Sequence, residues 1–139
     1  MDYSQLKKYL EGLYITIPTL FNDPDMSINE DGIRQHVSFL KSNGINRQNA
    51  VLLAGGAAGD FSTMSFDERV RVAGIVKEAA GDIPVAVGAQ TTSTMELERL
   101  AQAAEEIGAS FIQVSCPFYF NHTQDDFYEH ILAVSRSAK

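Results

Sequence analysis

The sequence predicts an α/β fold built on a parallel sheet, and two observations carry this prediction. Four short runs rich in Leu, Ile and Val recur without clean polar alternation, as is typical of strands buried on both faces of a parallel sheet. A stretch with apolar residues at helical spacing follows each run. Such alternation implies right-handed crossovers, in either an open doubly wound sheet or part of a closed barrel.

The four predicted strands are LYITIP at 13–18, AVLLAG at 50–55, IPVAVG at 83–88 and FIQVSC at 111–116. Each predicted helix begins with Ser or Thr followed three residues later by an acid. These pairs are Ser27 with Glu30, Ser65 with Glu68, Ser93 with Glu96, and Thr123 with Asp126. The first three are full capping boxes and the fourth is a weaker version. Glycines at 44, 81 and 108 stand where three of these helices would stop.

Length and charge limit the classes of protein to consider. A chain of 139 residues is the size of one ordinary domain, so we expect residues 1–139 to form a single domain. The formal charge of −7 leaves no basic surface for nucleic acid or anionic lipid. No stretch reaches membrane-spanning length and no cleavable leader is recognisable. We therefore expect a soluble cytoplasmic protein, and the single cysteine agrees with a reducing compartment.

A cluster of glycines, LLAGGAAGDF at 52–61, follows the second predicted strand. Ala54, Gly56 and Gly59 fall one glycine short of the dinucleotide-binding fingerprint, and the capping box at Ser65 starts the helix too late for it. The next strand also ends without the acid that would bind a ribose. Dinucleotide binding is therefore not expected, and a tight strand-to-helix turn without any ligand remains an alternative.

Several motifs in collinear order resemble one known family. They are Pro18-Thr19 at the end of the first strand, GGAAGDF with the following MSFDER, IPVAVGA at the third strand, and PFYFNHTQDDFYEHI after the fourth. This order resembles the dihydrodipicolinate synthase and N-acetylneuraminate lyase family. The resemblance implies a TIM (β/α)8 barrel in which pyruvate or a related 2-oxo acid forms a Schiff base with a lysine. On this reading the chain is the (βα)4 N-terminal half, with parallel strands in the order 1-2-3-4 that end near Pro18, Gly55, Gly88 and Cys116.

The resemblance also assigns candidate site residues. In the family the glycine cluster reads Gly-Thr/Ser-Thr-Gly-Glu and binds the substrate carboxylate, which gives the substrate-binding candidates Gly56, Ala57, Ala58 and Gly59. Consecutive amides in a glycine-rich backbone can form an anion-binding nest. Thr19 matches a position at the floor of the active site, although a buried threonine can also simply bond the backbone. Tyr119 matches a catalytic tyrosine inserted into a neighbouring subunit, although packing at a strand end would explain it equally well.

Two departures from the family pattern affect the expected chemistry. Ala57 and Ala58 stand at the two hydroxyl positions, so only main-chain donors remain for a carboxylate, and the side chain that would relay a proton at the first position is missing. In the family the Schiff-base lysine lies on strand 6 and a proton-shuttling tyrosine on strand 5, beyond the four strands predicted here. Open strand edges and an apolar inner face then favour association, with a homo-oligomer (dimer or tetramer) as the expected assembly.

The remaining polar residues suggest no metal or cofactor. His36, His122 and His130 lack ligand spacing, and Cys116 reads as a small buried hydrophobic residue. Two functions stay open. The first is a Schiff-base lyase or synthase of which this chain is half, and the second is a non-catalytic half-barrel that binds a small carboxylate or only assembles with partners.

Overall fold

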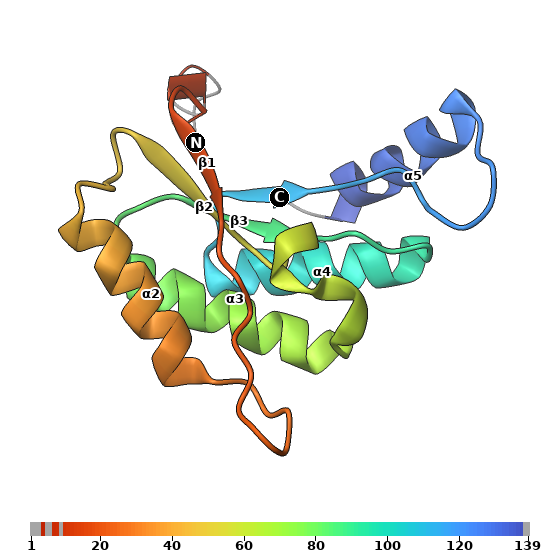
Figure 1. The fold of residues 1–139 in the computed structure, drawn as a ribbon. Helices are drawn as coiled ribbons and strands as arrows, with labels where there is room; N and C mark the ends of the chain where they lie inside the picture. The colour runs from red at the N-terminus through yellow and green to blue at the C-terminus, as the bar shows by residue number, and fades with distance from the viewer. Residues whose placement is uncertain (1–3, 5–6, 9, 138–139) are drawn as a thin grey trace.

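The computed structural model describes residues 4, 7–8 and 10–137, in which strands and helices alternate (Figure 1). The strands are β1 (Leu13–Thr16), β2 (Ala50–Ala54), β3 (Val85–Gly88) and β4 (Phe111–Gln113). The helices are α2 (Glu30–Ser42), α3 (Phe66–Ala80), α4 (Thr94–Ile107) and α5 (Gln124–Ser137). Two short 3-10 turns, η1 (Ala57–Gly59) and η2 (Phe61–Thr63), lie between β2 and α3.

The four strands form one parallel sheet in the order β1-β2-β3-β4. Each strand pairs with the next one along the chain, as the barrel interpretation predicts and a doubly wound sheet would not allow. Two strands end earlier than expected. The Ile17 N–H still donates to Leu53, but Pro18 has no N–H with which to continue the ladder. β4 ends at Gln113, opposite the last residue of β3, so Cys116 lies in the following loop and is exposed rather than buried.

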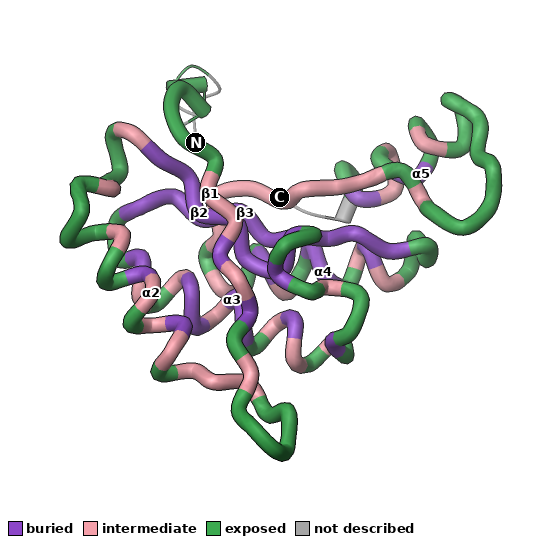
Figure 2. The backbone as a smooth tube through the Cα atoms, viewed as in Figure 1, coloured by how far each residue is buried: buried purple, intermediate pink, exposed green. Residues whose placement is uncertain are grey.

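Helices α2, α3 and α4 cover one face of the sheet, and the main core lies between them and the strands (Figures 1 and 2). β2 and β3 are buried along their whole length, as predicted. β1 and β4 are not fully buried, because an edge strand of this sheet has a neighbour on one side only. On the other face Val51, Leu53 and Ala86 form a small buried cluster with Phe111.

The starts of the helices correct one sequence prediction and strengthen another. α2 is capped by Asn29, whose Oδ1 accepts from the Gly32 N–H at 2.8 Å, and not by a box at Ser27. The Ser27 hydroxyl donates instead to Asp25, because residues 22–28 form a turn of their own. Before α5, by contrast, Thr123 and Asp126 form both bonds of a capping box. The box at Ser65 and Glu68 is present as predicted.

An ion network joins the exposed sides of α2 and α3. Glu30, at the start of α2, accepts from Arg34 at 3.0 Å and from the Nε of Arg71 on α3 at 2.6 Å. Arg34 also reaches Glu78 on α3 at 3.0 Å. The hydrogen bonds from Arg34 and then Arg71 lower the pKa of the Glu30 carboxyl. The network therefore links the two helices outside the hydrophobic core.

Helix α5 packs against α4 at the side of the sheet (Figure 1). Its Val134 is buried, whereas Ile131, three residues earlier, is 41% exposed. Within residues 4, 7–8 and 10–137, no helix combines the length and apolar character needed to cross a membrane.

Candidate active site at the carboxyl ends of the strands

Residues 55–60, which we call the glycine loop, leave β2 in a compact conformation. Gly55 has a φ of +64°, Gly56 is extended, and residues 57–59 form the turn η1. The N–H groups of Gly59 and Asp60 donate to the carbonyls of Gly56 and Ala57 within the loop. Asp60 then adopts a left-handed conformation, with a φ of +52°, between the two turns. The predicted substrate-binding residues from Gly56 to Gly59 thus lie in one tight turn.

Three glycines at this edge of the sheet have close neighbours, a side chain at Gly56 and backbone at Gly59 and Gly88. A Cβ on Gly56 would lie 2.5 Å from Leu53, and a Cβ on Gly59 would lie 3.0 Å from the carbonyl oxygen of Ile17. The tightest contact is at the end of β3, where a Cβ on Gly88 would lie 2.1 Å from the Gly55 carbonyl oxygen. The glycine loop therefore rests directly on the backbone at the ends of β1 and β3.

Thr19 holds the far end of the glycine loop. Its side chain is buried, and its hydroxyl donates to the Gly59 carbonyl at 2.6 Å. This is the backbone bond that the sequence left open as the alternative to a substrate contact. Ala57 and Ala58, between the two fixed ends, are exposed and carry no hydrogen-bonding side chain. A ligand at this point of the loop would meet main-chain groups.

Tyr119 lies in a second loop, residues 117–121, which we call the aromatic loop. Tyr119 has a φ of +84° and is 89% exposed, with its ring edge-on to Phe120 at a centroid distance of 4.8 Å. The preceding Phe118 packs edge-on against Phe61 of η2 at 6.0 Å. The structure thus brings Thr19 and residues 56–59 together, and it places Tyr119 on a neighbouring loop that contacts the turn after the glycine loop.

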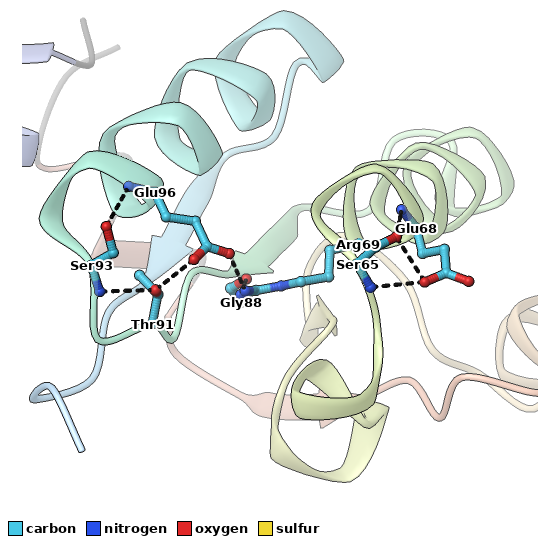
Figure 3. A network of polar contacts seen from close by, with 7 residues as sticks. All are labelled: Ser65, Glu68, Arg69, Gly88, Thr91, Ser93 and Glu96. Carbon is cyan, nitrogen blue, oxygen red and sulfur yellow. Dashed lines mark hydrogen bonds and ion pairs between the residues drawn. The ribbon is translucent and has the colours of Figure 1, made fainter. Parts of the chain in front are cut away.

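A buried arginine completes this rim of the sheet, and the sequence reading missed it. Arg69, near the start of α3, is 5% exposed. One of its guanidinium nitrogens donates to the Gly88 carbonyl at 3.0 Å and another lies 3.5 Å from Glu96 of α4 (Figure 3). Glu96 in turn accepts from the Thr91 hydroxyl at 2.9 Å. The Glu96 carboxylate is therefore engaged here and does not bond the Ser93 backbone. Only half of the predicted capping box forms, in which the Glu96 N–H donates to the Ser93 hydroxyl.

Several features of its surroundings disfavour the buried, charged guanidinium of Arg69. Burial lowers the pKa of the guanidinium, and Glu96 only partly opposes this shift. The positive charge also lies near the positive end of the dipole of α3. Its Nε is buried without a hydrogen-bond partner. The signal available in the sequence was an arginine directly after the acids of the MSFDER capping box, where an anionic side chain would be more favourable.

Another buried polar residue fixes α5 to α4. His130 is 4% exposed, and its Nδ1 lies 2.9 Å from the Thr94 hydroxyl at the start of α4. Burial, with a smaller contribution from His122, lowers the pKa of the imidazole. Among the residues that the structure describes, no three His, Cys, Asp or Glu side chains gather as metal ligands.

Comparison with known proteins agrees with this geometry. The model of the dihydrodipicolinate synthetase family matches residues 10–139. A 4-hydroxy-tetrahydrodipicolinate synthase from Chloroherpeton thalassium is 33% identical over 132 residues, which cover 94% of this chain and 42% of the relative. The corresponding enzyme from Bradyrhizobium diazoefficiens is 34% identical over 130 residues, with 93% and 42% coverage. The chain thus spans about 42% of the length of these curated relatives.

Solved structures show the same fold. A crystal structure of dihydrodipicolinate synthase superposes with a TM-score of 0.84 at 28% identity and covers 93% of this chain and 43% of that protein. The Acinetobacter baumannii enzyme, solved in complex with pyruvate, gives a TM-score of 0.80 at 26% identity, with the same coverage. The four strand–helix units are half of a TIM barrel, and the chain belongs to the dihydrodipicolinate synthetase family.

Proposed function

We propose that the protein carrying this chain is a Schiff-base lyase or synthase that acts on pyruvate or a related 2-oxo acid, without a metal or organic cofactor. The observation that carries this proposal is the glycine loop, fixed at the carboxyl ends of the strands, where TIM-barrel enzymes have their active sites. In support, the curated relatives are named synthases, and one solved neighbour was crystallised with pyruvate.

In this proposal the backbone of the glycine loop binds the substrate carboxylate. The amides of Gly59 and Asp60 are used inside the loop, so the proposed donors are those of Gly56, Ala57 and Ala58. Closely spaced backbone N–H groups attract anions through their dipoles. The absence of hydroxyls at Ala57 and Ala58 means that protons would have to move by another route than a relay through this loop.

The reactive lysine is proposed to come from the other half of the barrel. A Schiff-base lysine needs a desolvated site that lowers its pKa. Lys41 is exposed near the end of α2 and donates to the Ala79 carbonyl, and Lys77 lies in the last turn of α3. Lys7 and Lys8 are exposed before β1, and Lys139 lies outside the described residues. We accordingly take residues 1–139 as a single N-terminal half-barrel domain.

Tyr119 is proposed as a catalytic residue that acts across a subunit interface in a cytoplasmic homo-oligomer, a dimer or a tetramer. Its exposed ring belongs to a loop with two further exposed aromatic side chains, Phe118 and Phe120. Contact with a second subunit would remove this apolar surface from water.

Trapping with borohydride tests the chemistry. The protein at its natural length, incubated with pyruvate and borohydride, should gain the mass of one reduced pyruvate, and peptide mapping should place it outside residues 1–139. The 139-residue chain alone should gain none. An adduct on Lys41 or Lys77 would contradict the proposed origin of the lysine, and a natural-length protein that never labels would exclude the Schiff-base mechanism.

A second function, a non-catalytic half-barrel that binds a small carboxylate or only assembles, is favoured by Ala57 and Ala58. Titration calorimetry separates the two functions, because a protein that binds pyruvate but never forms the adduct fits only the second. Ala57→Thr and Ala58→Thr should tighten pyruvate binding if the loop holds the carboxylate, because a bond to a charged group is worth about 1.5–3 kcal/mol. Unchanged affinity would mean that the carboxylate binds elsewhere.

A further inference from the structure

We infer that Arg69 is a positioning residue, whose buried guanidinium holds the glycine loop in its binding conformation from behind the site. The inference rests on the proposed function, since it assigns the loop as the carboxylate site. The observation behind it is the burial of the Arg69 side chain. Arg69 is almost fully buried, although a buried guanidinium is costly unless it is well paired, and its pairing with Glu96 at 3.5 Å is loose.

Arg69 contacts the backbone on which the start of the glycine loop rests. Arg69 donates to the carbonyl of Gly88 at 3.0 Å in a fully buried bond. Gly88 is also the residue whose α-carbon leaves no room for a side chain beside the Gly55 carbonyl. By fixing the peptide at Gly88, the guanidinium fixes the surface on which Gly55 rests.

Arg69 also lies beside Phe61, at the other end of the loop. The guanidinium carbon of Arg69 lies 5.6 Å from the centre of the Phe61 ring, close enough for a cation–π interaction. Phe61 directly follows Asp60, the last residue of the glycine loop. One side chain therefore reaches the residue after the loop directly and the first residue of the loop through Gly88.

Glu96 holds the Arg69 side chain in turn. Glu96 lies at the start of α4, where its carboxylate accepts from the buried Thr91 and faces Arg69 (Figure 3). Thr19 closes the loop on the opposite side through Gly59. The loop is thus held between Thr19, in the segment after β1, and an α3–α4 pair on the other side, and neither Thr19 nor Arg69 needs to touch the substrate.

Hydrogen exchange measures this role without any substrate. In the protein at its natural length, Arg69→Met should speed exchange of the Gly59 and Asp60 amides at least about tenfold, the usual worth of a hydrogen bond from a charged donor. Exchange in α2 should not change. The matched control is Arg71→Met, two residues further along α3, where the side chain is exposed and bonds Glu30. It should leave the loop amides unchanged.

Kinetics provides the second measurement. Arg69→Met should raise the KM for pyruvate about tenfold with a smaller effect on kcat, because it loosens a binding loop. Arg69→Lys, which keeps a charged donor, should recover part of the loss. Faster loop exchange with an unchanged KM would show that Arg69 holds the loop but that the loop does not bind the carboxylate. The two proposals can therefore fail separately.

Two results would overturn the inference. One is unchanged exchange at Gly59 and Asp60 in Arg69→Met. The other is an equal increase throughout α2 and α3, which would indicate a purely structural role. Should Arg69→Met fail to fold, Glu96→Gln replaces it, because the amide can still accept from Thr91 but leaves Arg69 without a counter-charge. Glu96→Gln should also speed exchange at the two loop amides, and unchanged exchange there would overturn the inference as well.

Discussion

The glycine loop and the aromatic loop both follow strands at the same edge of the sheet. They differ in how much of each loop packs against the rest of the chain. The glycine loop has almost no side chains; its three glycines are buried, Gly59 against Ile17 after β1 and Gly55 against β3, and Thr19 bonds the Gly59 carbonyl. The aromatic loop has large side chains, and three consecutive ones, Phe118, Tyr119 and Phe120, are exposed.

The difference shows how a rim can hold two kinds of site. A loop packed through its backbone has its shape fixed by the half-barrel itself, so its amides are oriented before a ligand arrives. A loop that presents exposed aromatic rings makes fewer contacts with its own chain and is free to make them with another surface. Mutations that add or remove a single atom should therefore affect the first loop far more than the second.

The largest effect is expected for Gly88→Ala. The new methyl carbon would lie 2.1 Å from the Gly55 carbonyl oxygen. Because this contact is with backbone, no flexible side chain can move aside to relieve it. We expect a loss of about 3 kcal/mol in the free energy of unfolding, at the upper end for overpacking, measured by urea denaturation. Gly74→Ala in α3 is the control, with open space around the added methyl, and should gain about 0.5–1 kcal/mol. Equal effects of the two changes would contradict the close contact.

Thr19→Val should have the next largest effect. It keeps the shape of the side chain but leaves the buried Gly59 carbonyl without its donor, which costs about 1–3 kcal/mol. Thr63→Val removes a similar bond, from an exposed hydroxyl to the Asp60 carbonyl, and should cost less than about 0.5 kcal/mol because water replaces the donor. A Thr19→Val protein as stable as Thr63→Val would show that the Thr19 bond does not hold the loop.

In the aromatic loop we expect a smaller change in the free energy of unfolding, and one that stabilises the protein. Tyr119 has a φ of +84°, which glycine adopts without strain, so Tyr119→Gly should raise stability by about 1 kcal/mol. Tyr119→Ala retains the strained backbone and should change stability little, because the ring is exposed. Thermal unfolding of both variants tests this. A marked loss of stability in both would mean that the ring packs on the rest of the chain.

The smallest effect concerns the anchoring of α5, which follows the aromatic loop. Burial lowers the pKa of His130 below its ordinary 6.5, so the folded protein favours the neutral imidazole. The stability that this provides is complete above pH 6.5 and is lost as the pH falls from 6.5 towards the folded pKa, since the unfolded chain then binds the proton first. Urea unfolding at about pH 7.5 and about pH 5.5 should show a smaller loss for His130→Phe than for the unchanged protein. An equal loss would mean that His130 does not contribute.

Much of the fold was predictable from the sequence because local signals agreed with one another. The apolar runs and capping pairs located all four strands and the starts of α3, α4 and α5. The predicted start of α2 was wrong because Asn29, and not Ser27, caps the helix. Asn and Ser are both favoured as N-cap residues. Cys116 was wrongly expected to be buried, because pairing of β4 stops where β3 ends, and only the neighbouring strand determines that.

The candidate site was predictable only in part. The glycine cluster and its place after β2 were evident, because glycine at this density indicates close backbone contact. The partner of each close contact was not, since Ile17 and Gly88 approach the loop only in the folded sheet. Arg69 was missed for the same reason. Its position on the helix predicts an exposed charge, and only the packing of α3 against the end of β3 buries it.

The shared carboxylate of Glu30 has a consequence for how the molecule responds to its solvent. The carboxylate pairs with Arg34 on α2 and with Arg71 on α3, and both ion pairs lie at the surface. Mobile ions screen such charges over a distance of about 10 Å at 0.1 M salt, whereas the buried bond between Arg69 and Gly88 is shielded from them. Rising ionic strength should therefore loosen α2 from α3 at their outer edge and leave the rim of the barrel in place, so that salt acts on one side of α3 and not on the other.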